Sequence, residues 1–194
     1  MKIFSRDNPS RPLIMVCTTY AIVCYALFFI AWLLPTPEWA PTLMAWFAKT
    51  IKAIAVSTRV GELNGYDPFP IQVVILYCAV GITPITVYCI QFCLFNQSNR
   101  RKWFDGFLDK AKEKKISRQK LLFMGVVTLS AAIWVPYLTF FYEWNNLEWR
   151  TIKGYSPTIF ATLLFLIGSF IPTLGSLAGG GGIYLVFSKH PKKS

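Results

Sequence analysis

The chain has 194 residues, of which 54% are hydrophobic and 16% aromatic, and its formal net charge is +11. A chain of this length and composition has room for one apolar helical domain and excludes an additional soluble enzyme module. The positive charge alone would also suit a nucleic-acid-binding protein. The positions of the basic residues along the chain must therefore distinguish between these two classes of protein.

Four long stretches contain no Asp, Glu, Lys, Arg or His: 13–34, 71–95, 121–142 and 158–187. The hydrocarbon core of a bilayer is about 30 Å thick and requires about 20 apolar residues of helix to cross it. In lipid, only helices and closed barrels satisfy every backbone polar group. We therefore predict an all-α polytopic membrane protein, a single domain (1–194) with four transmembrane helices at these positions.

The charges predict the orientation of the four spans. The N-terminal segment, the loop 96–120 and the C-terminal tail together hold 15 basic and 4 acidic residues, whereas the loops 35–70 and 143–157 together hold five of each. Lys and Arg accumulate on the cytoplasmic side of membranes. Both termini and the basic loop are thus predicted to be cytoplasmic, and the other two loops to be outside. The same rule accounts for the net charge, so no nucleic-acid partner is expected.

The first outer loop contains an amphipathic segment, 42–56. Its apolar residues recur at helical spacing, and Lys49 and Lys52 fall outside the stripe formed by Leu43, Trp46, Phe47, Ile51 and Ile54. A helix lying in the membrane interface would give this pattern. A cap packed on the end of the bundle would give it equally well, and both interpretations keep the loop near the lipid surface.

The outer loops also contain candidate partner contacts. Arg59, Glu62 and Asp67 form the most polar external patch and could pair with charges across an interface, with a solvated loop as the alternative. In the second outer loop, Trp149 is of a residue type enriched at binding hot spots. An aromatic belt at the membrane surface is the alternative interpretation for Trp149.

On the inner side, the cluster Arg100, Arg101, Lys102 and Trp103 follows the second span. Basic residues beside a span are attracted to anionic lipid headgroups, so this cluster is predicted to be a headgroup anchor.

The fourth span is longer than a bilayer core requires and is rich in small residues. Gly175 and Gly179 form a G-x-x-x-G step, and Gly168 and Pro172 precede them. Such steps let helices approach closely. Pro172 is expected to kink the helix and the glycine run 179–182 to loosen its inner end. Gly168, Gly175 and Gly179 are thus candidate contacts to a membrane partner, and packing against the other three spans is the alternative.

No arrangement of residues points to catalysis. All five cysteines lie in spans, the one histidine lies in the C-terminal tail, and no acidic residue lies within a span. Ionisable groups inside spans usually mark ion pathways and proton relays. We therefore expect no catalytic, cofactor or metal site, and expect membrane lipids and another membrane-embedded protein as partners.

Several short strings lie at the ends of the spans: residues 54–58 (IAVST), 66–68 (YDP), 77–78 (YC) and 161–164 (ATLL). With four spans, cytoplasmic termini and no catalytic group, the chain resembles the immunity proteins against pore-forming colicins, of the colicin A and B type. It departs from that pattern in its glycine-rich fourth span and its longer basic inner loop.

The resemblance implies a function in the inner membrane of a bacterium that produces such a toxin. The protein would bind the membrane-inserted helices of the toxin before the channel opens, through its small-residue surfaces and outer loops. The alternative is a structural or accessory subunit of a larger inner-membrane secretion, conjugation or transport complex, since exposed small-residue faces fit both functions.

Overall fold

The computed structural model describes residues 11–95, 99, 116–142 and 157–187 of the chain. Of these residues, 88% are helical and none lies in a strand. The predicted all-α fold is therefore confirmed for the described part of the chain.

Four helices are long and apolar enough to cross a membrane, with mean hydropathies between 1.9 and 2.3. They are α1 (Arg11–Leu33), α4 (Phe69–Ile90) with a π-helical extension η2 (Gln91–Phe95), α7 (Arg118–Phe140), and a fourth made of α8 (Pro157–Phe165), the π-helical segment η5 (Leu166–Phe170) and α9 (Ile171–Phe187). The four predicted spans are thus confirmed, and each begins within three residues of its predicted start.

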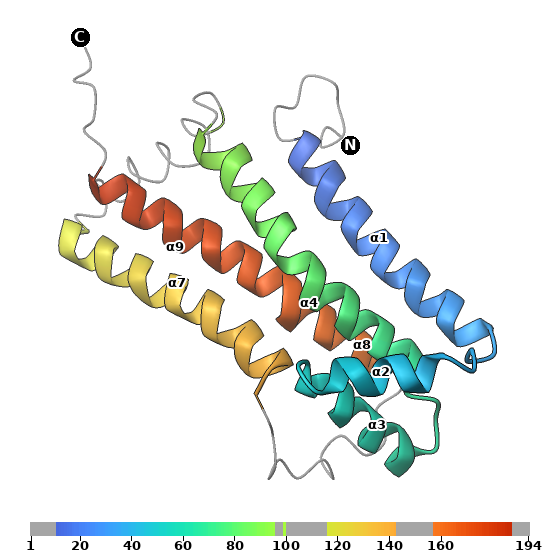
Figure 1. The fold of residues 1–194 in the computed structure, drawn as a ribbon. Coiled ribbons are helices and arrows are strands. Elements are labelled where there is room, and N and C mark those ends of the chain that lie inside the picture. The colour runs from blue at the N-terminus through green and yellow to red at the C-terminus, as the bar shows by residue number, and fades with distance from the viewer. Residues whose placement is uncertain (1–10, 96–98, 100–115, 143–156, 188–194) are drawn as a thin grey trace.

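The four helices lie side by side, with α4 next to α1 on one side and to the fourth helix on the other (Figure 1). Helix α7 packs chiefly against α9, so α1 and α7 lie at opposite edges of the array. Large apolar side chains such as Ile22 on α1 and Phe123 on α7 are exposed. Exposure of this kind is costly in water but ordinary in a span that faces lipid.

Polar side chains inside the spans are paired across helices. The Tyr20 hydroxyl lies 3.1 Å from Ser169 Oγ, and the Tyr77 hydroxyl donates to the Tyr20 carbonyl at 3.0 Å. Further along α1, the Tyr25 hydroxyl donates to Thr162 Oγ1 at 3.0 Å. Side-chain hydrogen bonds between spans stabilise their association because lipid offers no alternative partner. These bonds join α1 both to α4 and to the fourth helix.

The fourth helix differs in part from the expectation of a kinked, loosened span. The π-helical segment η5 ends two residues before Pro172, and α9 then continues through the glycine run to Phe187. Proline removes one backbone donor and crowds the preceding turn, and a wider π turn is a recognised way for a helix to accommodate such a site. The glycine run stays helical because part of it packs closely against α7.

Two short helices, α2 (Ala40–Ala48) and α3 (Lys52–Asn64), lie between α1 and α4 at one end of the array (Figure 1). We call them the cap, and this end the capped end. The predicted amphipathic segment 42–56 is therefore not one helix. It breaks before Ile51, whose backbone is extended (φ −96°, ψ 90°). Ile51 and Ile54 are buried, which favours the interpretation of a cap packed on the bundle.

Candidate functional site: the cap and its aromatic face

The cap is held on the bundle by apolar side chains from both of its helices. Ala40 and Met44 of α2, one helical turn apart, and Ile54 and Val60 of α3 are buried. Ser57 is also buried, and its hydroxyl donates to the Ile54 carbonyl at 2.7 Å. Burying an apolar side chain such as Met44, Ile54 or Val60 contributes about 1.5–3 kcal/mol in water. The cap is therefore a fixed part of the fold at this end.

The chain leaves α3 through a left-handed residue. Gly65, with φ +70°, follows the last residue of α3, and its backbone N–H donates to the Gly61 carbonyl. Only glycine adopts this backbone conformation without a steric cost. Burial raises the pKa of the next residue, Tyr66, above its ordinary value.

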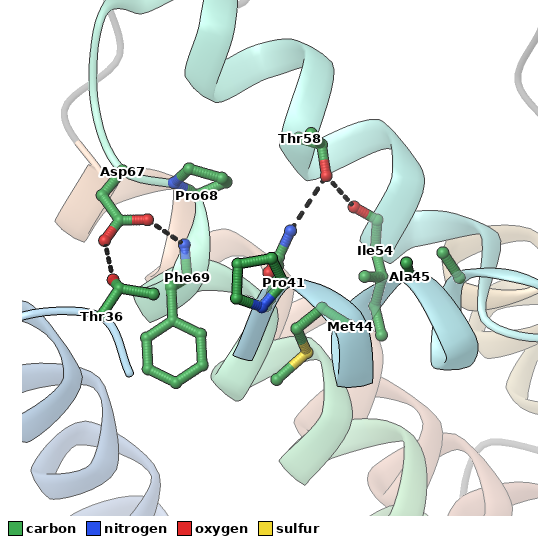
Figure 2. Close-up of a pocket in the computed structure, with 11 residues that line it drawn as sticks. Thr36, Pro41, Met44, Ala45, Ile54, Thr58, Asp67, Pro68 and Phe69 are labelled. Atoms are coloured by element: carbon green, nitrogen blue, oxygen red, sulfur yellow. Dashed lines mark hydrogen bonds between the residues drawn. The ribbon is translucent and has the colours of Figure 1, made fainter. Parts of the chain in front are cut away.

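Asp67 connects three parts of the capped end. Its carboxylate accepts a hydrogen bond from the Thr36 hydroxyl, which lies in the segment between α1 and α2 (Figure 2). It also accepts one from the backbone N–H of Phe69, at 2.9 Å, where α4 begins. A carboxylate at a helix N-terminus satisfies a free N–H and interacts favourably with the helix dipole. Asp67 thus orients the entry to the second span.

A small cavity of about 210 Å³ lies between α2, α3 and the start of α4. Most of its wall is apolar, including Met44 and Ile54 (Figure 2). Its buried polar group, Gln72, donates to Thr58 Oγ1 at 3.0 Å, and the Thr58 hydroxyl donates to the Ile54 carbonyl at 3.2 Å. Sites for cofactors and drug-sized ligands are usually about 300–1,000 Å³, so this cavity is too small for a cofactor.

The outward side of α2 exposes large apolar side chains. Trp39, which caps the N-terminus of α2, is 59% exposed, Leu43 is 39% exposed and Trp46 is 62% exposed. We call these three residues the aromatic face. The opposite side of α2 buries Ala40 and Met44, so the helix is apolar on both sides. A helix that is hydrophobic all round is not suited to bulk water, and the aromatic face is therefore suited to a lipid surface or another protein.

The aromatic face is supported by ring contacts with side chains beneath it. The Trp39 ring meets Phe69 edge-on with centroids 6.4 Å apart, and the Trp46 ring meets Phe47 edge-on at 4.9 Å. Such aromatic pairs contribute about 0.5–1.5 kcal/mol beyond the stabilisation that comes from burying their surface area. Each exposed indole thus has one aromatic ring packed against it, and Trp is a residue type enriched among the anchor residues of interfaces.

The three charged candidates in the first outer loop do not act alike. Arg59 and Glu62 lie exposed on α3, and neither forms an ion pair with another residue that the structure describes. Asp67 is also exposed, but both of its carboxylate oxygens accept hydrogen bonds within the chain. Its carboxylate therefore serves contacts within the chain at the start of α4, whereas Arg59 and Glu62 have no ion pair among the described residues.

The candidate glycines are used for packing within the chain. A Cβ built on Gly179 would lie 2.6 Å from the Leu129 backbone nitrogen of α7, and one on Gly175 would lie 3.0 Å from the Ala132 Cβ. At Gly168 the added atom would meet the ring of Phe140. Gly168, Gly175 and Gly179 thus pack against α7, as the alternative of packing between the spans predicts, and their contact with a membrane partner stays a prediction.

Five predicted contacts lie outside the described residues. They are Trp149 in the second outer loop and the headgroup anchor Arg100, Arg101, Lys102 and Trp103.

Sequence reasoning missed the polar contacts that fix the capped end. Asp-Pro directly before an apolar run is a start signal for a helix, so the capping role of Asp67 could have been found. Asp67 is bonded by Thr36, and Gln72 is bonded to Thr58. Neither threonine stands out in the sequence, and only the folded chain brings these pairs together.

Within the described ranges, no group of three or more His, Cys, Asp or Glu side chains could hold a metal ion. Comparisons with protein-family models, with curated proteins and with solved structures found no match. The function must therefore be argued from the geometry of this chain alone.

Proposed function

We propose that this protein is an inner-membrane immunity protein, which protects a bacterium by binding the membrane-inserted domain of a pore-forming toxin. The observation that carries the proposal is the aromatic face, because it presents two positioned indoles and Leu43 on a fixed cap. Trp is among the residue types that dominate binding energy at protein interfaces.

The proposed topology puts this surface where a toxin arrives. With basic segments inside and the loop 35–70 outside, the cap lies at the outer surface of the membrane. The helices of a toxin that inserts from that side pass this interface. An aromatic face there would meet them before a channel opens. Arg59 and Glu62, exposed on α3 of the same cap, would add selectivity through charge rather than most of the affinity.

The proposal requires binding and no chemistry. The hydroxyls of Tyr20, Tyr25 and Tyr77 are used in hydrogen bonds between spans. The small-residue face of α9 is closed by α7. Among the described residues, the cap therefore remains as the surface for recognition, which suits a protein that intercepts another membrane protein.

A protection assay tests the proposal. A toxin-sensitive strain that expresses the chain is challenged with a panel of pore-forming colicins, and survival is measured at matched membrane levels. We expect protection against at least one toxin. Replacing Trp39 and Trp46 together by alanine should reduce it strongly, because loss of a hot spot costs about 2 kcal/mol or more, a factor of about 30 in affinity.

The matched control replaces exposed apolar residues away from the cap, Ile22→Ala and Phe123→Ala, which should leave protection intact. Equal protection by all variants would remove the aromatic face from the mechanism. A wild-type chain that protects against no toxin on the panel would count against the immunity function.

The alternative function, an accessory subunit of a larger inner-membrane complex, predicts a different result. A tagged chain purified in mild detergent from unstressed native cells would then carry stoichiometric membrane partners. An immunity protein should be recovered without them.

A further inference from the structure

Two thiols face each other where α1 packs against α4. The Sγ atoms of Cys17 and Cys89 are 4.0 Å apart, and both cysteines are free. A disulfide bond is about 2.05 Å long, so the two sulfurs would have to approach by about 2 Å.

One of these thiols is accessible from the surface. Cys17 is only half-buried and lines an open cavity of about 350 Å³ between α1 and the fourth helix. The other side chains of its wall are mostly apolar, among them Ala21, Ile85 and Phe165. A cavity of this composition within a span admits molecules that dissolve in lipid rather than ions.

A second pair of cysteines on the same two helices lacks this access. Cys24 of α1 and Cys78 of α4 also contact each other, but they are 2% and 0% exposed. Neither lines the open cavity. The chain therefore contains one pair with an accessible thiol, Cys17, and one pair with none, which provides an internal control.

We propose that Cys17 and Cys89 form a reversible disulfide when an apolar hydroperoxide, of the class that oxidised lipids form, enters this cavity. The Cys17 sulfur attacks the terminal peroxide oxygen, the O–O bond breaks, and the thiol proton goes to the leaving oxygen. The products are a sulfenic acid at Cys17 and an alcohol. The Cys89 sulfur then attacks the Cys17 sulfur, and the S–O bond breaks to release water. The peroxide is reduced and the two thiols are oxidised.

The disulfide would fix α1 on α4. Helix α1 lies at the edge of the array and meets the fourth helix mainly through side chains such as Tyr20 and Tyr25. A covalent bond between α1 and α4 would prevent α1 from separating. This inference does not depend on toxin binding, because it concerns the opposite half of α1 from the cap.

The experiment treats vesicles that contain the full-length chain with cumene hydroperoxide. Free thiols are then counted after denaturation, by the gel shift that a polyethylene-glycol maleimide produces. We expect two of the five thiols to be lost without any dimer on a non-reducing gel, and dithiothreitol to restore both. Mass spectrometry of the wild type should find the Cys17 peptide linked to the Cys89 peptide, a readout that requires no variant.

Variants identify each step. Cys89→Ser should lose one thiol and retain a sulfenic acid at Cys17 that dimedone traps. The matched control Cys24→Ser should still lose two thiols. A link between other cysteines, an intermolecular dimer, or a wild-type chain that retains all five thiols would overturn the proposal.

Discussion

The close contact between α7 and α9 makes one substitution especially informative, Gly179→Ala. A Cβ at this position would lie 2.6 Å from the Leu129 nitrogen and 2.8 Å from the Gly125 carbonyl oxygen. Ordinary contacts begin near 3.4 Å, and both neighbours are backbone atoms that cannot rotate away. The two helices would therefore have to separate by several tenths of an ångström along their tightest contact. Overpacking of this kind costs about 1–3 kcal/mol.

The next residue offers a matched control. A Cβ at Gly180 would have no atom within 4 Å. Both substitutions gain the same helix propensity, about 1 kcal/mol, so this contribution cancels when the two variants are compared. We therefore expect Gly179→Ala to be less stable than Gly180→Ala by about 1–3 kcal/mol, and Gly180→Ala to be at least as stable as the wild type.

The assay is equilibrium unfolding in mixed micelles of mild detergent and SDS, followed by tryptophan fluorescence. The midpoint for Gly179→Ala should fall below that of Gly180→Ala. If both variants unfold at the same SDS fraction, the assignment of Gly179 to the contact with α7 is refuted. The face of α9 would then be free for a partner after all.

Three further outcomes follow from the capped end and the tyrosine pairs. Gly65→Ala should cost about 1 kcal/mol, because only its positive φ opposes the change, and Gly65→Asn should cost less, in the same unfolding assay. Asp67→Ala should cost about 1 kcal/mol and speed amide exchange at Phe69, with no change at the opposite end of α4. Tyr20→Phe should lower the free energy of unfolding by about 0.6–1.7 kcal/mol, the range for hydrogen bonds between spans. Adding Ser169→Ala to this variant should lower it little further, because both substitutions remove the same hydrogen bond.

The positions of the spans could be predicted from the sequence because a charge-free run of about 20 residues or more is long enough to cross the bilayer core as a helix. The predicted stretch 71–95 and the observed helix, α4 with η2 (residues 69–95), begin two residues apart and end at the same residue. The cap was less predictable. The apolar stripe of 42–56 has helical spacing throughout, and nothing in it marks the extended backbone at Ile51 that divides α2 from α3.

The side-chain partners could not be predicted, because they depend on the register between helices. Thr86 and Thr128 both lie in predicted spans, and the sequence alone does not say whether either bonds to another helix. In the folded chain Thr86 lies 3.2 Å from Thr173 of α9, whereas Thr128 bonds to the Met124 carbonyl of its own helix. The glycine pattern had the same weakness. It predicts a close contact but not which helix provides it, and α7 of the same chain is the answer.

The π-helical segment Leu166–Phe170 sets the rotational phase of the fourth span. Before it, Phe165 faces Tyr20 and Tyr25 of α1, and after it, Gly175 and Gly179 face α7. Each residue of an α-helix turns the chain by about 100°. The π turn has i→i+5 bonds and so holds one residue more than an α-helical turn. Removing one residue here would keep the glycines facing α7 only if the segment became α-helical, so natural variants that lack this residue should lack the π turn as well.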